Sequence, residues 1–205
     1  MSQFHKICEE ASSGAQFARA YVDHLADVLK RLDFDAVGGV IDLFERAKAS
    51  GATIFFLGNG GSAATAAHFA NDLGFGASPE GSTPFRSLSL TTNNAFITCL
   101  ANDIGYENVF SWQLRNLMRE GDVVVGISAS GNSPNAVKAL EYARDNGGVP
   151  VAIVGFDGGS MKEIGEYVIH VESEKGEYGP VEDVHMVLDH LISNYLAVVE
   201  KRRIT

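Results

Sequence analysis

Residues 53–73 read TIFFLGNGGSAATAAHFANDL, and they contain the pattern from which the fold class is inferred. The run Thr53–Leu57 is short, apolar and rich in branched residues, which favours a buried strand. The glycine-rich segment GNGGS (58–62) follows at once, and a helical pattern then runs from Ala63 to Leu73. A strand, a tight turn and a helix in this order are the start of a βαβ unit.

The same alternation continues to the end of the chain. Four further strands are predicted at residues 87–90, 122–127, 149–154 and 167–171, with helices at 95–100, 108–118, 135–146 and 181–203. Two helices, 15–32 and 35–50, precede the first strand, and loops are expected at 74–86 and 172–180. This pattern indicates an α/β fold, a parallel sheet with helices on both faces. We expect a single domain over residues 1–205, with an N-terminal helical segment (1–50) and an α/β core (51–205).

The composition excludes several classes of protein. The chain has 205 residues, 45% of them hydrophobic, so it can bury a core. Its 26 acidic side chains outnumber 16 basic ones, and a net charge of −10 repels a phosphate backbone, so we expect no direct nucleic-acid binding. No apolar run reaches about 18 residues, which argues against a membrane span. A polar N-terminus and only two cysteines, Cys8 and Cys99, favour the reducing cytoplasm.

The turn GNGGS (58–62) has the features of an anion site. Its glycines let the backbone approach a ligand, and the helix that follows offers unpaired N–H groups and a partial positive charge. The turn is not a Walker P-loop, since no Gly-Lys-Ser/Thr follows. It is not a dinucleotide fingerprint either, since Ala63 stands where the third glycine belongs. A plain turn between strand and helix is the alternative interpretation.

A second turn of this kind strengthens the anion-site interpretation. The strand 122–127 runs into SASGNS (128–133), and Pro134 opens a helix. The serines of this turn supply hydroxyl and backbone donors without a cation, which suits a phosphate monoester. Ser133 has a simpler alternative, an N-cap of the helix. A third turn, residues 155–160, is interpreted as a tight turn ahead of a helix that contains Met161.

Two histidines and two carboxylates form a second candidate group. His68 and Asp72 stand four residues apart on the helix after GNGGS and share a face. Glu182 and His190 stand eight residues apart on the last helix, about 80° around its axis, which is compatible with one broad face. These ligand types suit a divalent metal such as zinc, while structural or solvated histidines are the alternative.

The last helix carries two more ionisable side chains. His185 and Asp189 are expected at interface or surface positions, without a part in the site.

The order strand–GNGGS–helix and then strand–SxSGNS–helix resembles the sugar isomerase (SIS) domain family, and within it the phosphoheptose isomerases. The similarity covers about residues 15–200 and includes Ala101-Asn102-Asp103, GDVVVGISASGNS (121–133) and FDGGSM (156–161). The resemblance implies a flavodoxin-like three-layer sandwich with five parallel strands. It also implies a homotetramer with sites between subunits, and an enzyme that interconverts sedoheptulose 7-phosphate and a manno-heptose 7-phosphate.

The resemblance also implies roles for single residues. The substrate would contact Asn59, Gly60, Gly61, Ser62, Asp72, Asn102, Asp103, Ser128, Ala129, Ser130, Ser133 and Glu182, with the phosphate on the serines. Zinc would be held by His68, Asp72, Glu182 and His190. Asp72 is the candidate base and His190 its partner. A metal-bound Asp72 is a poorer base, so its two roles are alternatives.

The chain departs from the family at several positions. Asp72 stands where the family has Glu, and Glu182 stands where it has Gln, which adds a negative charge. The loop GFGAS (74–78) lacks the family's Arg, for which Arg86 is a candidate substitute, and Gly179-Pro180 replace an Asp-Arg pair. A different sugar phosphate and a non-catalytic SIS protein that binds a phosphosugar or a partner protein are therefore alternatives. A transcription regulator is disfavoured, because the 50 N-terminal residues are acidic and too short for a DNA-binding head.

Overall fold

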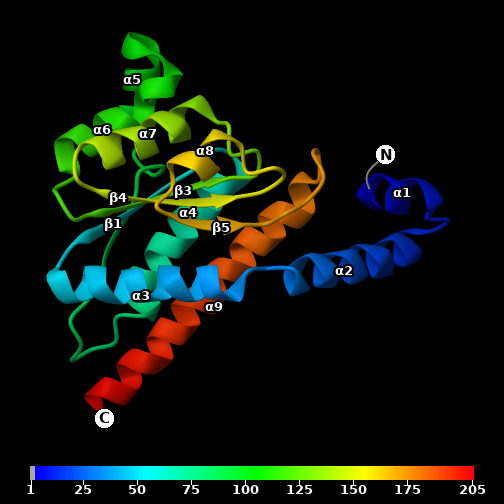
Figure 1. Cartoon of the computed structure of the whole chain (residues 1–205), viewed down its shortest axis with the longest axis horizontal. Helices are drawn as coiled ribbons and strands as arrows, with labels where there is room; N and C mark the ends of the chain where they lie inside the picture. Colours follow the sequence, from blue (N-terminus) through cyan, green and yellow to red (C-terminus); the bar gives the residue numbers. More distant parts are fainter. Residues whose placement is uncertain (1–2) are drawn as a thin grey trace.

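The computed structural model describes residues 3–205, so residues 1 and 2 of the predicted domain lie outside the described part. Five strands form one sheet in which all neighbours run parallel (Figure 1). They are β1 (Thr53–Leu57), β2 (Arg86–Ser89), β3 (Val123–Ser128), β4 (Val149–Val154) and β5 (Tyr167–His170), in the spatial order β2-β1-β3-β4-β5. Each predicted strand is confirmed to within one residue. The order is that of flavodoxin-like folds, which confirms the predicted fold class.

Helices cover both faces of this sheet and make three layers. On one face pack α3 (Phe34–Ser50), α4 (Gly61–Asn71) and α9 (Tyr178–Ile204), and on the other α5 (Asn94–Ile104), α6 (Val109–Leu117), α7 (Pro134–Asp145) and α8 (Gly159–Ile164). Alternate strand residues enter the two cores: in β3, Val123 and Val125 face the first and Val124 the second. All three are buried, which explains why the strands are almost continuous apolar runs.

The N-terminal part holds one helix more than the sequence predicted. α2 (Gly14–Lys30) and α3 correspond to the two predicted helices, and a short α1 (Gln3–Glu10) precedes them. The expectation of two leading helices was therefore incomplete. α1 was missed because it is eight residues long and mostly polar; its Phe4 packs edge-on against Tyr21 of α2. α2 extends outward from the body of the fold (Figure 1).

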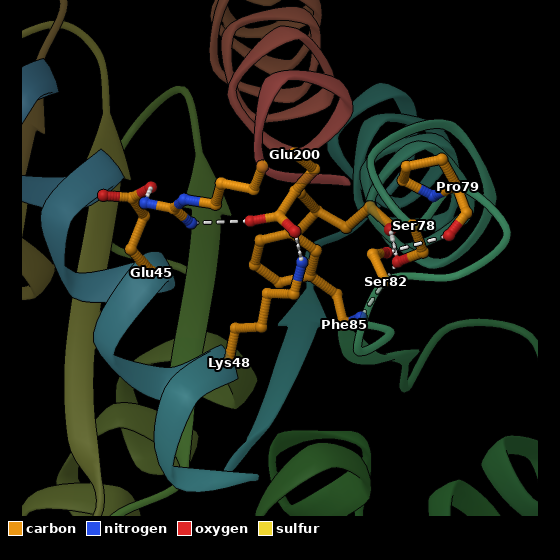
Figure 2. Close-up of polar contacts among 9 residues, drawn as sticks. Glu45, Lys48, Ser78, Pro79, Ser82, Phe85 and Glu200 are labelled. Atoms are coloured by element: carbon orange, nitrogen blue, oxygen red, sulfur yellow. Dashed lines mark hydrogen bonds and ion pairs between the residues drawn. The ribbon is translucent and has the colours of Figure 1, made fainter. Parts of the chain in front are cut away.

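The C-terminal end of α9 is fixed to α3 by a buried ion pair. Lys48 Nζ lies 2.5 Å from Glu200 Oε2, and the two side chains are each only 7% exposed. Arg203 extends the network by bonding Glu200 and Glu45, and Lys48 also lies over the ring of Phe85 (Figure 2). The network holds α9 at one end, and the other half of this long helix packs along α4.

The two predicted loops are shorter than expected. α4 continues into a π-helical turn, Asp72–Gly76, so the loop before β2 begins only after it. The hydroxyl of Ser78 donates to the Leu73 carbonyl and accepts from Phe85 N–H, which ties this loop to the end of the turn (Figure 2). α9 begins at Tyr178, three residues earlier than predicted, and its first turn accommodates Pro180.

The topology places both glycine- and serine-rich turns at one edge of the sheet. α4 follows β1 onto one face, and α7 follows β3 onto the other. At such a switch point the two connections diverge and leave a ligand crevice at the carboxyl ends of the strands. Among residues 3–205, no helix is both long and apolar enough to cross a bilayer.

Candidate functional site

A hollow of about 180 Å³ lies at the carboxyl ends of β1 and β3, and we call it the serine pocket. It is lined by Asn59, Ser62, Ile127, Ser128, Ala129, Ser130, Ser133, Tyr178 and Glu182. The pocket thus joins residues from the GNGGS turn, from the SASGNS turn and from the start of α9. No Lys or Arg side chain is among these lining residues.

The hydroxyl groups of the second turn face one another. Ser128 Oγ lies 3.3 Å from Ser133 Oγ and 3.5 Å from Ser130 Oγ. Ser133 occupies the N-cap position of α7, but its side chain caps no backbone N–H. Ser128 Oγ accepts the Gly131 N–H at 3.2 Å, which holds the turn closed. Three hydroxyls therefore converge on the pocket, a suitable set of donors for phosphate oxygens.

The 155–160 turn supports the serine turn from behind. Met161 N–H donates to the Gly131 carbonyl at 2.9 Å, and Ser160 N–H donates to the Asn132 side chain at 3.0 Å. Gly131 has a φ of 62°, and a Cβ there would collide with the carbonyl oxygen of Gly158. The interpretation of residues 155–160 as a tight turn was correct but incomplete, because the turn also fixes the shape of the pocket.

Asn59 is held by two residues that the sequence analysis did not single out. Its side-chain amide exchanges two hydrogen bonds of 2.8 Å with Asn135, which is buried at the start of α7. The hydroxyl of Tyr106 donates to the same Asn59 oxygen at 2.9 Å. Asn59 thus links the first turn to the second and orients GNGGS. Gly60, with a φ of 53°, supplies the sharp entry into α4.

Glu182 reaches the pocket from the first turns of α9. Its carboxylate lies against the Cα of Gly61, where any Cβ would strike it. A Cβ at position 61 would displace the carboxylate end of the Glu182 side chain from this place. Burial, and secondarily the charge of Asp183, raise the pKa of Glu182 above its usual range.

A second group of side chains lies further along α4 and α9. The ligand atoms of His68, Asp72, Asp189 and His190 all lie within 4.8 Å of one another, and we call these four residues the His–Asp cluster. His68 Nε2 lies 3.2 Å from His190 Nε2 and 3.5 Å from Asp72 Oδ2. Three of the four predicted metal ligands therefore meet. Glu182 is not in the cluster, and Asp189 is.

The structure corrects the expectation for His185 and Asp189, which are buried at 1% and 0% exposure instead of lying at the surface. Neither side chain has a hydrogen bond of good geometry. Burial lowers the pKa of His185 to about 4, although its ring faces the Val154 carbonyl. Burial and then the charge of Asp72 raise the pKa of Asp189 to about 7. A buried carboxylate without a partner fits a bound cation, and imidazole and carboxylate are donors that zinc takes.

Asn102 and Asp103 do not line the serine pocket. Both are exposed on α5, where the Asn102 amide donates to Asp103 Oδ1 at 2.8 Å. The structure therefore does not bring these two residues to the serine pocket of the same chain, and their contact with substrate stays a prediction.

Comparison with known proteins identifies the family of the chain. The SIS domain profile matches residues 17–155. The chain belongs to the SIS domain family. A phosphoheptose isomerase from Nitratidesulfovibrio vulgaris is 37% identical over 186 residues, 91% of this chain and 84% of the relative. A probable phosphoheptose isomerase from Thermoplasma acidophilum is 35% identical over 175 residues, which cover 85% of this chain and 94% of the relative. The solved phosphoheptose isomerase from Neisseria gonorrhoeae has a TM-score of 0.77 at 30% identity, over 89% of this chain and 95% of that one.

Asn135, which bonds Asn59 of the serine pocket, and Asp189, a member of the His–Asp cluster, both have sequence contexts that could have pointed to them. Asn135 follows SASGNS and Pro134 directly, a polar residue at the start of a helix beside a candidate anion turn. Asp189 stands four residues after His185, and both share the helix face that carries Val181 and Ile192. A carboxylate on an apolar face needs a partner, and this was the signal for a role inside the fold.

Proposed function

We propose that this SIS domain is a phosphoheptose isomerase, an aldose–ketose isomerase that interconverts sedoheptulose 7-phosphate and D-glycero-D-manno-heptose 7-phosphate. The observation that carries the proposal is the arrangement of two sites along the same pair of helices. The serine pocket lies at the start of α4 and α9, and the His–Asp cluster lies further along both. From Ser62 to His68, α4 rises by about 9 Å. An extended phosphosugar can span that separation, with its phosphate in the pocket and its carbonyl end at the cluster.

The phosphate is held by neutral donors. Ser62, in the first turn of α4, and Ser128, Ser130 and Ser133 supply hydroxyl groups. The first N–H groups of α4 have no acceptor within the helix, and the N-terminal ends of α4 and α7 both carry partial positive charge. A protein of net charge −10 can therefore bind an anionic substrate without a local Lys or Arg.

The sugar carbons lie between the pocket and the cluster. Glu182, against Gly61, stands beside this path and is suited to accept hydrogen bonds from sugar hydroxyls. The GNGGS backbone, with Gly60 and Gly61, faces the same path. These contacts fix the position of the sugar's carbon chain along the site, and this position determines which carbon meets the catalytic groups.

The reaction moves one proton between neighbouring carbons. In the direction from ketose to aldose, Asp72 takes a proton from C1 while His190 protonates the oxygen on C2. The enediol then takes a proton on C2 and loses the hydroxyl proton on C1, which leaves the aldehyde. A zinc ion held by His68, Asp72 and His190 would supply positive charge to the substrate oxygens, and Asp72 and His190 would then act as its ligands instead of as free base and acid. The zinc content of Asp72→Asn distinguishes the roles of Asp72, because loss of zinc identifies it as a ligand.

The proposal is tested with sedoheptulose 7-phosphate as substrate, with and without a chelator. We expect turnover, and we expect His190→Gln to lose on the order of 100-fold or more in kcat while phosphosugar binding is kept. Folded protein that gives no turnover in either condition would overturn the proposal and favour a phosphosugar-binding SIS protein. Unchanged activity of His190→Gln would remove His190 from the mechanism.

We further propose that the chain forms a homotetramer with sites between subunits. Four apolar side chains, Val187, Leu191, Tyr195 and Val198, are 37–52% exposed along one face of α9. His190 lies next to Leu191 and is exposed, so a subunit docked on this face would close over the His–Asp cluster. Asn102 and Asp103 would then serve the site of a neighbouring subunit. The free thiols of Cys8 and Cys99 support a location in the reducing cytoplasm.

A further inference from the structure

The carboxylate of Asp189 has no partner in the fold. It is 0% exposed, and neither oxygen forms a hydrogen bond within the described chain. Its neighbours in the His–Asp cluster are a second carboxylate, Asp72, and two imidazoles, His68 and His190. A buried ionised carboxylate without a counter-charge is strongly unfavourable, and a second carboxylate beside it makes it more so. A cation bound among these four side chains would supply the missing counter-charge.

The spacing of the donor atoms fits one small ion. In a tetrahedral zinc site the ligand atoms lie about 2.0–2.3 Å from the metal, which puts them roughly 3.3–3.7 Å from one another. The separation of His68 Nε2 from His190 Nε2 is 3.2 Å, and that from Asp72 Oδ2 is 3.5 Å. Asp189 supplies the fourth potential ligand atom, which lies within 4.8 Å of each of the other three.

Glu182 is occupied elsewhere. It precedes His190 by eight residues, which is about 12 Å along the axis of α9. Its carboxylate lies against Gly61 in the serine pocket, outside the His–Asp cluster. The two carboxylates of α9 thus face different parts of the site, Glu182 toward the substrate and Asp189 toward the histidines.

We propose that Asp189 is the fourth metal ligand of this chain and that Glu182 is not a ligand. The metal site then consists of His68, Asp72, Asp189 and His190. This inference rests on the metal site of the proposed function, but it concerns which residues hold the ion and is tested without any substrate.

The test measures zinc affinity by competition with a chromogenic chelator, and the absorption spectrum of Co²⁺ as a substitute ion. Asp189→Asn should weaken zinc binding on the order of 100-fold or more and change the Co²⁺ spectrum, since one anionic ligand is removed. Glu182→Gln is the matched control and should keep both the affinity, to within about twofold, and the spectrum. The proposal would be overturned if Glu182→Gln lost zinc affinity while Asp189→Asn kept it, or if the wild type bound no zinc.

A second measurement guards against a variant that fails for structural reasons. Zinc should raise the melting temperature of the wild type and of Glu182→Gln but not of Asp189→Asn. In the metal-free state Asp189→Asn should melt at or above the wild-type temperature, because the substitution removes a buried unpaired charge. A metal-free Asp189→Asn that is destabilised yet still responds to zinc would show a structural role and overturn the proposal. Neither readout depends on isomerase activity, so failure of the proposed function leaves this result interpretable.

Discussion

The hydroxyl of Ser133 faces Ser128 across the serine pocket, although Ser133 occupies the N-cap position of α7. Ser133→Ala should therefore leave stability almost unchanged and raise the KM for the phosphosugar on the order of 10- to 100-fold, since a hydrogen bond to a charged phosphate is lost. Thermal unfolding and steady-state kinetics check this.

Ser13→Ala is the matched control for Ser133→Ala. The Ser13 side chain does cap α2, accepting from Gln16 N–H at 3.2 Å. Its loss should cost about 1 kcal/mol of stability and leave KM unchanged. If Ser133→Ala instead destabilises the protein as Ser13→Ala does and keeps its KM, Ser133 is a cap and not a phosphate ligand.

His185 predicts a specific dependence of stability on pH. Burial lowers the pKa of the folded protein's His185 to about 4, against about 6.5 in the unfolded chain. Between these values the unfolded chain binds a proton that the folded protein does not, so stability falls as the pH drops through this window. From pH 7 to pH 5 the loss amounts to about 2 kcal/mol.

The measurement is urea unfolding of the metal-free protein at pH 7 and pH 5. Asp189 acts in the opposite sense, because its raised pKa lets the folded state take up a proton as the pH falls through about 7. The comparison is therefore made with His185→Leu, which removes the His185 contribution alone. The wild type should lose about 2 kcal/mol more than His185→Leu between the two pH values. If the wild type and His185→Leu lost the same free energy of unfolding between pH 7 and pH 5, the lowered pKa of His185 would not be the cause of the pH dependence.

At the scale of secondary-structure elements, the serine turn and the 155–160 turn act as one unit. Gly131→Ala would force a Cβ at a φ of 62° against the Gly158 carbonyl, so one of the two turns must move. We expect a stability loss of about 2 kcal/mol or more and loss of phosphosugar binding. Gly38→Ala in α3 is the control: nothing lies within 4 Å of its Cβ, and it should stabilise by about 1 kcal/mol. If Gly131→Ala kept the wild-type KM, this would contradict the conclusion that the two turns act as one unit.

The elements themselves followed closely from the sequence, for a physical reason. A strand buried on both faces, such as β3, must be apolar throughout, so its residues mark it without ambiguity. Turn residues mark the ends: Asp33 caps α3, and Gly51 ends it in the left-handed conformation. α1 escaped prediction because its aromatic anchor, Phe4, packs on residues of another helix, and such contacts leave no periodic signal in eight residues.

The site was predictable only in part, because helix periodicity does not fix how two helices cross. Glu182, Asp189 and His190 all stand on α9, and the sequence shows their angles around that helix. Which of them meets His68 and Asp72 depends on where α9 lies along α4, and the distant Lys48–Glu200 pair helps to set that position. The serines needed no such information, since each follows its strand directly to the edge of the sheet.

At the scale of the whole molecule, the outer face of α9 decides whether one chain is complete. Val187, Leu191, Tyr195 and Val198 follow one another at steps of four, four and three residues, so they form one apolar stripe on a helix otherwise built into the core. Such a stripe is stable in water when another surface covers it, at about 25 cal/mol per Å² buried. Light scattering after size exclusion should give the mass of a tetramer for the wild type.

Leu191→Lys places a charge in the middle of this stripe and should shift the protein to smaller species, while each chain stays folded by circular dichroism. Activity should fall with it and become dependent on protein concentration, since the sites are proposed to lie between subunits. Leu117→Lys is the control, because Leu117 is 47% exposed on α6, across the sheet from α9, and its substitution should change neither mass nor activity. A monomeric wild type, or a tetrameric Leu191→Lys, would show that the stripe on α9 does not join subunits.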